Sequence, residues 1–222
     1  MIKAVTIGLA GVLLIAGCGK SFDTVLSERH GEAEPKLKQI EQVGRGALTY
    51  QEELKDIALP EGEKLRFGDA PNAVLVQAEL FESAPEKRRP RLDLILDTSW
   101  LTETRKALSD APEKFDGAYL ERLFDTLAAI KFLVVIRTRL LAEPAAAGGG
   151  LFSPGLWQGE VMVFEVASGD FLGGAPLSVS NSDEVDVNAE DPGKWLHSDL
   201  WSNTRASVSA ALQGHTEGAI LS

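Results

Sequence analysis

The sequence has almost no cysteine and very little histidine. Its 222 residues contain one cysteine, Cys18, and three histidines, which stand far apart at positions 30, 197 and 215. A chain without a second thiol forms no internal disulfide and no thiolate metal centre. The histidines lack the short spacing of a metal-binding pair on one helical face. We therefore expect no metal site, and the core alone must stabilise the fold.

The sequence also lacks the short motifs of common catalytic and cofactor sites. It has no glycine-rich phosphate loop and no nucleophile elbow. His197, Ser198 and Asp199 are the residue types of a hydrolase triad, but three adjacent residues cannot align nucleophile, base and orienting carboxylate. We expect Ser198 to cap the last helix instead. We predict no cofactor and no catalytic residue, although paired carboxylates would need no local signature.

The apolar N-terminal stretch is too short to cross a bilayer. After Lys3, thirteen residues from Ala4 to Ala16 carry no charge, whereas a spanning helix needs about 20 apolar residues. A basic start, a short apolar run and small residues at its end are typical of a cleaved export signal. The sequence thus predicts a signal peptide over residues 1–17, a helical entry segment over 18–58 and an α+β domain over 59–222.

The residues before the cysteine are more specific. Ile15-Ala16-Gly17-Cys18, preceded by two leucines, resembles the lipobox of bacterial lipoproteins. The resemblance implies a diacylglyceryl group on the Cys18 thiol, cleavage before Cys18 and acylation of the new amino terminus. Gly19, rather than an aspartate, follows the cysteine, which implies the outer membrane rather than the inner one. The alternative is an ordinary secretory peptide that happens to end near a cysteine.

Positive charge is scarce. The chain has 22 Lys and Arg against 33 Asp and Glu, and removal of residues 1–17, with their single base, would leave a net charge of −12. Such a chain is repelled by nucleic acid and by anionic lipid, and export removes nucleic acid as a partner. An anchor would overcome the repulsion, because each buried methylene contributes about 0.8 kcal/mol. The one basic cluster, residues 86–91, is interpreted as a solvated hairpin loop; the alternative is contact with a phosphate-bearing envelope polymer or lipid headgroup.

The hydrophobic spacing predicts helices and strands in alternation. We expect a helix from Ser21, interrupted by Gly31, and a second helix from Pro35. Further helices are expected at 99–108, from Asp116 or Gly117, and from about Ser198. Strands are expected at 73–81, 92–96, 132–136, 160–167 and 175–179, of which 132–136 is apolar throughout and suits a central position buried on both faces. The predicted fold class is α+β, an antiparallel sheet with helices packed mainly on one face.

Behind an anchor cysteine, this order of elements resembles that of the lipoproteins that activate peptidoglycan synthases and, more distantly, of the curli-secretion lipoprotein. The likeness includes a hairpin that pairs residues 161–166 with the strand after Gly169. No sequence motif of those families is matched, and a likeness of fold does not fix function.

Two segments between the predicted elements are candidate sites. The connection from Leu141 to Gln158 has small residues followed by Phe152 and Trp157, which gives a possible contact loop for a membrane or a partner; the alternative is that both aromatic residues pack on the sheet. Residues 184–190 place oxygen-bearing side chains at alternate positions, as a calcium loop begins. They lack the required glycine and glutamate, so we interpret them as a solvated acidic loop.

These observations predict a lipid-anchored envelope protein that faces the periplasm and acts as a non-catalytic binding or scaffold module. Its partners would be the membrane, through Cys18, and another envelope protein or the cell wall. The alternative is an envelope hydrolase that uses paired carboxylates. A subunit of a secretion or pore assembly ranks last, because such a subunit needs amphipathic hairpins of about 10 alternating residues and the sequence indicates none.

Overall fold

The computed structural model describes residues 20–68, 70–82, 96, 98–148, 151–186, 191–218 and 220. The predicted signal peptide, Cys18 and the basic segment at 86–91 lie outside them, as does the strand predicted at 92–96 apart from Leu96. The described elements follow in the order α1 (Phe22–Thr49), β1 (Leu65–Arg66), β2 (Ala73–Gln77), η1 (Ala78–Phe81), α2 (Ser99–Ala107), α3 (Gly117–Ala129), β3 (Phe132–Ala142), β4 (Ala145–Gly148), β5 (Leu151–Ser153), β6 (Leu156–Glu165), β7 (Phe171–Ser180), α4 (Pro192–Leu212), η3 (Gln213–His215) and β8 (Thr216–Glu217).

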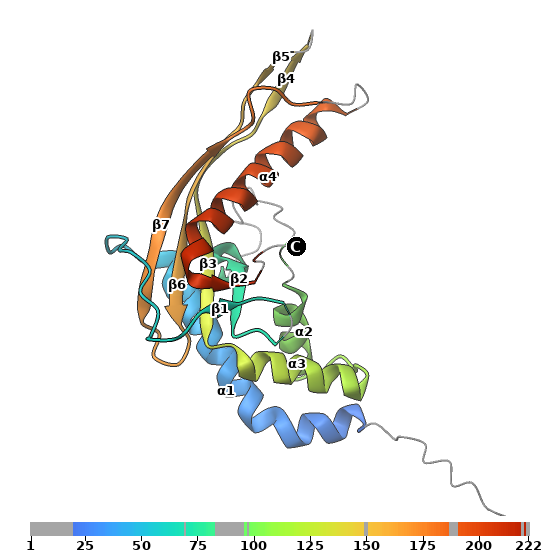
Figure 1. Ribbon diagram of the computed structural model, residues 1–222. Coiled ribbons are helices and arrows are strands. Elements are labelled where there is room, and N and C mark those ends of the chain that lie inside the picture. Colours follow the sequence, from blue (N-terminus) through green and yellow to red (C-terminus); the bar gives the residue numbers. More distant parts are fainter. Residues whose placement is uncertain are drawn as a thin grey trace, which may run out of the picture.

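The main sheet is mixed, not antiparallel as the sequence predicted. Its strand order is β2-β3-β6-β7, with β2 parallel to β3 and the other two pairs antiparallel. Parallel strands need a long crossover, and here α2 and α3 supply it between β2 and β3 (Figure 1). The predicted pairing of residues 161–166 with the strand after Gly169 is confirmed for residues 161–164, whereas Val166 lies beyond the end of β6. The α+β class is also confirmed in its coarse form.

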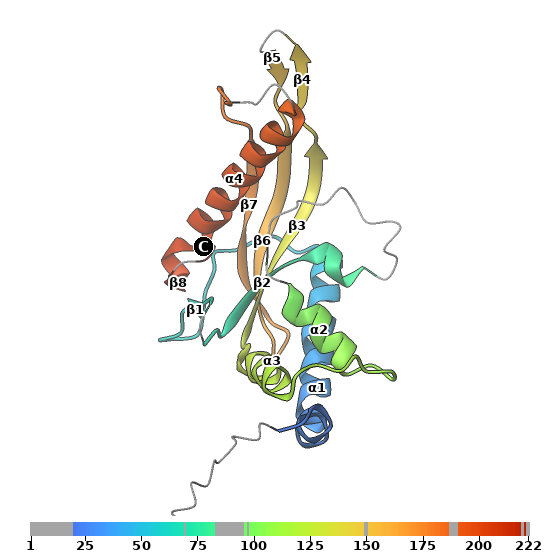
Figure 2. The ribbon, with the colours of Figure 1, turned by 90° about the vertical axis from the view of Figure 1, so that its right-hand side faces the viewer.

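Helices cover both faces of this sheet, whereas the sequence predicted them mainly on one. Figure 2 shows α4 on one side and α1 and α2 on the other. Leu133 and Val135 of β3 pack in the core formed with α1, α2 and α3, while Val134 and Ile136 pack in the core that contains α4. Alternate residues of a strand point to opposite faces. The prediction of a central strand buried on both faces is therefore confirmed for residues 132–136.

The predicted pair of entry helices is one continuous helix of 28 residues, α1. Gly31 and Pro35 both lie inside it, although an interior proline costs about 3 kcal/mol. Figure 1 shows α1 bent between its two halves, and proline is a common cause of such a bend. The apolar face continues on both sides of the proline, so packing holds the helix together through it. Its buried side chains are Phe22, Val25, Ala33, Leu37, Ile40, Val43 and Ala47.

Several predicted boundaries change. The strand predicted at 73–81 ends at Gln77 and continues as η1. The last helix begins at Pro192, because the Asp191 side chain accepts a hydrogen bond from the Lys194 amide at 3.1 Å and proline suits a first turn. Ser198 is therefore inside α4 and does not cap it. The predicted start of α3 is confirmed, with Asp116 as its cap.

The predicted loop between residues 141 and 158 is a β-hairpin instead. β3 and β6 pair as far as Ala142 and Leu156, and β4 and β5 then form a separate two-stranded sheet. Figure 1 shows this sheet projecting past the start of α4. We call residues 145–148 and 151–153 the β4–β5 arm. β3 has 11 residues and β6 and β7 have 10 each, so strands of about 10 residues are present, but β3 is buried continuously over residues 132–138 and does not alternate.

A buried arginine joins α1 to the sheet. Arg137 of β3 is 4% exposed, and its Nη1 donates to the main-chain carbonyls of Ala47 at 2.7 Å and Tyr50 at 2.8 Å. Its Nε donates to Glu160 Oε2 at 2.8 Å and its Nη2 to the same atom at 2.5 Å. The last carbonyls of a helix have no partner within the helix. Arg137 therefore caps α1 and neutralises the carboxylate of β6 at once.

Replacing Arg137 by alanine should lower the free energy of unfolding by about 3–5 kcal/mol, because Glu160 would be left with its side chain only 15% exposed and without its main ion-pair partner. Arg139 binds the same carboxylate at 3.0 Å but is 45% exposed, so Arg139→Ala is the matched control and should cost about 0–1 kcal/mol. Denaturation of both variants by guanidinium measures the difference. Equal losses would contradict this role of Arg137.

Candidate functional site

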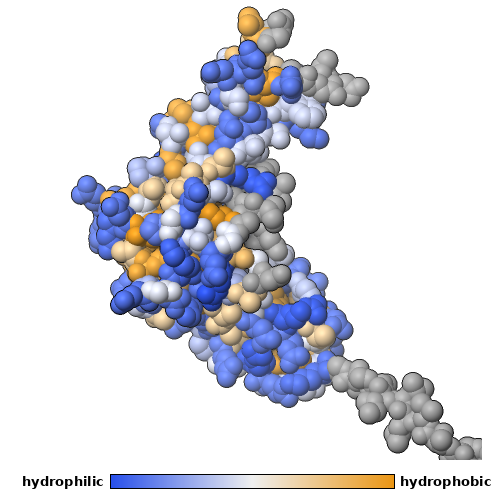
Figure 3. Space-filling model, viewed as in Figure 1, coloured by the Kyte–Doolittle hydropathy of each residue, from blue (hydrophilic) through white to orange (hydrophobic). Residues whose placement is uncertain are grey.

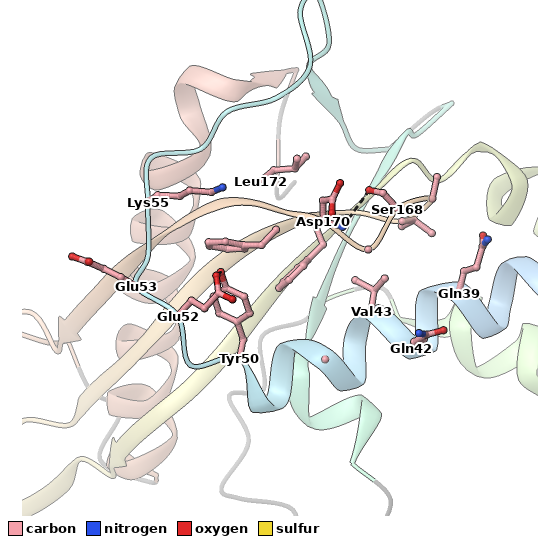
Figure 4. Close-up of a pocket in the computed structure, with 16 residues that line it drawn as sticks. Gln39, Gln42, Val43, Tyr50, Glu52, Glu53, Lys55, Ser168, Asp170 and Leu172 are labelled. Carbon is pink, nitrogen blue, oxygen red and sulfur yellow. Dashed lines mark hydrogen bonds between the residues drawn. The ribbon is translucent and has the colours of Figure 1, made fainter.

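An open groove of about 1030 Å³ lies between α1 and the turn that joins β6 to β7 (Figure 4). One side is formed by the last turns of α1 and the other by the extended chain at residues 50–55, and the turn at residues 166–170 forms one end. We call it the α1–β7 groove. A cavity of this volume is at the upper end of the range for sites that bind small organic ligands.

Three aromatic rings form the floor of the α1–β7 groove. The Tyr50 ring lies 4.4 Å from Phe171 and 5.9 Å from Phe164, measured between ring centroids. Tyr50 reaches this position because α1 ends at Thr49, directly before it. Phe164 is buried, whereas Tyr50 and Phe171 are half-buried. The floor therefore offers partly accessible aromatic surface.

Polar side chains surround this floor. Gln39 and Gln42 are exposed on α1 (Figure 4), and neither side chain forms a hydrogen bond with another described residue. The Lys55 ammonium lies 5.7 Å from the centroid of the Phe171 ring, in cation–π range. The Tyr50 hydroxyl donates to Glu52 Oε2 at 3.2 Å. Partial burial, together with this hydrogen bond, raises the pKa of Tyr50 above 10.0, so the hydroxyl is neutral and able to donate.

The chain that forms the far side of the groove is tied to the edge of the sheet. The Gly174 amide donates to the Lys55 carbonyl, and the Ala58 amide to the Leu172 carbonyl, each at 2.8 Å. Gly173 has φ +131°, and a Cβ there would lie 2.4 Å from the Asp56 carbonyl oxygen. Only glycine permits this approach. The pair Gly173-Gly174 was the sequence signal for this site, but sequence reasoning missed it.

The predicted contact residues Phe152 and Trp157 are in different environments. Trp157 is fully buried in β6, and its Nε1 donates to Thr138 Oγ1 at 3.1 Å. The alternative interpretation, packing on the sheet, is correct for this residue. Phe152 belongs to the β4–β5 arm and is half-buried, next to Leu151, which is 73% exposed.

The β4–β5 arm is unusual in its composition. No charged residue lies between Glu143 and Glu160, and Ala145, Ala146, Ala147 and Leu151 are all exposed. Figure 3 shows hydrophobic side chains at the surface of the upper end of the molecule, where the arm projects. A two-stranded hairpin is at best marginally stable in water, so an uncharged arm of this kind is suited to contact with another surface.

The base of the arm is attached to α4 by histidine. His197 Nε2 lies 2.6 Å from Glu143 Oε2, and its Nδ1 lies 2.7 Å from the Gly193 carbonyl. His30 is in α1 and His215 in η3, so the three histidines are not brought together. Among the described residues, no group of three or more His, Cys, Asp or Glu side chains could hold a metal ion. The acidic loop is described only as far as Asp186, and Cys18 is outside the described residues.

Asp199 has a structural role in the described fold. Its carboxylate accepts hydrogen bonds from the Ser182 amide and hydroxyl, both at 2.8 Å, and from the Asn181 side chain at 2.9 Å. It thereby connects α4 to the chain that leaves β7. Desolvation opposes ionisation, but these hydrogen bonds prevail and lower the pKa of Asp199 below 3.8. Both oxygens of the Asp199 carboxylate are therefore engaged in this connection.

Two carboxyl groups lie close together in and beside η1, outside the α1–β7 groove. Glu79 is 5% exposed, and its Oε1 accepts a hydrogen bond from the Thr138 amide at 3.2 Å. Burial raises the pKa of Glu79 above 4.5, and the nearby charge of Glu82 adds to this. Glu82 Oε2 is buried and has no hydrogen-bond partner among the described residues. In the groove itself, Glu53 points away from Asp170 (Figure 4), so these two acids do not converge.

No family profile, curated protein or solved structure matches this chain.

The buried Glu79 should make the stability dependent on pH. Its proton is held more tightly in the folded chain than in the unfolded one, so the free energy of unfolding should fall as pH rises above 4.5. Glu79→Gln keeps an acceptor for Thr138 and should remove that part of the fall. Denaturation between about pH 4 and pH 8 measures it, with the exposed Glu53→Gln as control. Parallel curves for Glu79→Gln and the unaltered protein would contradict the assignment.

Proposed function

We propose that this chain is a lipid-anchored lipoprotein of the cell envelope that acts as a non-catalytic binding or scaffold module. The observation that carries the proposal is the sequence Ile15-Ala16-Gly17-Cys18 behind an apolar run and a basic start. The anchor would hold the chain at the membrane, more readily the outer than the inner, with the domain in the periplasm. Its partner would be another envelope protein or the cell wall.

The dimensions of the molecule are consistent with this role. Ser21 caps α1, only three residues after Cys18, and three residues span at most about 11 Å. The start of α1 and the β4–β5 arm lie at opposite ends of the molecule (Figure 1). From residue 132 to residue 148, at about 3.3 Å per residue, the strands cover about 50 Å. An anchored chain would therefore hold its base near the bilayer and present the arm away from it.

Two features favour binding over hydrolysis. The α1–β7 groove is open and has a half-buried aromatic floor, and neither the buried Glu79 nor the half-buried Glu82 lines it. A hydrolase with paired carboxylates needs both acids at the bound substrate.

No described helix has the length and apolar character needed to cross a membrane, and attachment through Cys18 would not require one.

Replacing Cys18 by serine should abolish lipid attachment. The unaltered chain should be recovered with membranes, with a mass that corresponds to residues 18–222 plus acyl groups, because a thioether cannot form on serine. Cys18→Ser should lose the acyl mass and leave the membrane fraction. Gly17→Ala, which keeps a small residue before the cleavage point, should behave as the unaltered chain. An unmodified N-terminal methionine on the native product would contradict the anchor.

The β4–β5 arm should carry the contact with a protein partner. Leu151→Ser combined with Phe152→Ser should reduce crosslinks to neighbouring proteins in intact cells at least tenfold, because burial of each side chain is worth about 1.5–3 kcal/mol and the two losses together correspond to more than a hundredfold in affinity. Because Leu151 is 73% exposed and Phe152 is only half-buried, the unfolding midpoint should fall little. Leu140→Ser, at an exposed site on β3 outside the arm, is the control. An unchanged crosslinking pattern would remove the arm from the proposal.

A further inference from the structure

We infer that the α1–β7 groove binds a glycan chain that carries little or no charge. This inference deepens the proposed function, on which its cellular setting rests, by naming the chemical class of a cell-wall ligand. It is carried by the combination of partly accessible aromatic rings with neutral amide side chains along one open groove.

The floor fits the apolar faces of sugar rings. One face of a pyranose presents mainly C–H groups, which gain by leaving water, and a flat aromatic ring is the matching surface because it is large, rigid and apolar. Tyr50 and Phe171 are half-buried, adjacent, and tilted by 45° to each other. Phe164 supports both from below at 5.9 and 5.4 Å. The rings are thus held in place before any ligand arrives.

The rim fits hydroxyl and acetamido groups. Gln39 and Gln42 stand one turn apart on α1, on the same side of the helix (Figure 4). A glutamine amide offers both donors and acceptors, which suits sugar hydroxyls that themselves both donate and accept. Ser168 and Asp170 at the turn, and Glu52 beside Tyr50, add further acceptors.

The charge of the groove excludes other ligand classes. Its charged side chains are Glu52, Glu53, Asp170 and Lys55, so acids outnumber the single base, and the chain as a whole is strongly acidic. Phosphate-bearing polymers, nucleotides and anionic headgroups would be repelled. Two classes then fit the charge, a neutral glycan and a cationic peptide. The paired glutamines favour the glycan, because neutral amides form hydrogen bonds with hydroxyl groups but provide no negative charge to attract a cationic peptide.

Titration calorimetry of the mature, full-length chain in detergent micelles, with a hexamer of N-acetylglucosamine, tests the inference. We expect saturable binding. Tyr50→Ala should weaken it about tenfold through loss of the stacking surface, and Gln42→Ala should weaken it about threefold through loss of a hydrogen bond. Tyr50→Phe keeps the ring and should retain most of the affinity. Gln213→Ala, an exposed glutamine at the end of α4 and outside the groove, should have no effect.

Gln42→Ala keeps the test meaningful if Tyr50→Ala fails to fold, because Gln42 is exposed and contributes nothing to the core. No binding of the hexamer, binding that Gln42→Ala and Tyr50→Ala both leave unchanged, or preferential binding of an oligolysine peptide would each overturn the inference. These outcomes are distinct from failure of the anchor. If the native chain is lipidated but does not bind the hexamer, only the glycan inference is overturned. If the native chain is not lipidated but binds the hexamer, only the proposed anchor is overturned.

Discussion

The guanidinium of Arg137 connects three parts of the molecule that are distant in sequence. It lies in the central strand, closes the end of the long entry helix and pairs with a carboxylate on the neighbouring strand. An ammonium group could not do this, because only a planar fork of five N–H donors can serve carbonyls on one side and a carboxylate on the other. Buried ion pairs often contribute little net stability. The contribution of this one is to fix where α1 ends relative to the sheet.

The position of that helix end decides the geometry of the groove. The Tyr50 carbonyl accepts a hydrogen bond from Arg137, which fixes the main chain of Tyr50. The Tyr50 ring packs beside the ring of Phe171. On the opposite side, Gly173 and Gly174 let the chain at residues 55–58 lie directly against β7. Two features of the backbone therefore set the two sides of one groove: the main chain of Tyr50, which Arg137 holds, and the glycine pair of β7.

The sequence allowed prediction of the parts of the fold that depend on local pattern. The apolar run at 132–136 identified the buried central strand, and Asp116 identified the start of α3. Prediction failed where distant contacts decide the outcome. Pro35 was expected to start a helix, yet the packing of α1 on both sides of it keeps the helix continuous. The small residues near position 147 were interpreted as part of a long connecting loop, but pairing in the hairpin that continues β3 and β6 orders them.

The candidate site was less predictable than the fold, for a physical reason. The groove brings together residues from positions 39 to 55 and from 164 to 172, and no spacing within either segment indicates the other. The β4–β5 arm was more predictable than the groove. Its lack of charge can be read from the sequence, whereas its hairpin structure cannot. If the chain is attached at residue 18, as we propose, the uncharged hairpin at the far end would separate two tasks, retention at a surface and contact beyond it. Each task would then have its own residues, and the proposed role as a module that joins two components of an envelope requires that loss of one task leave the other intact.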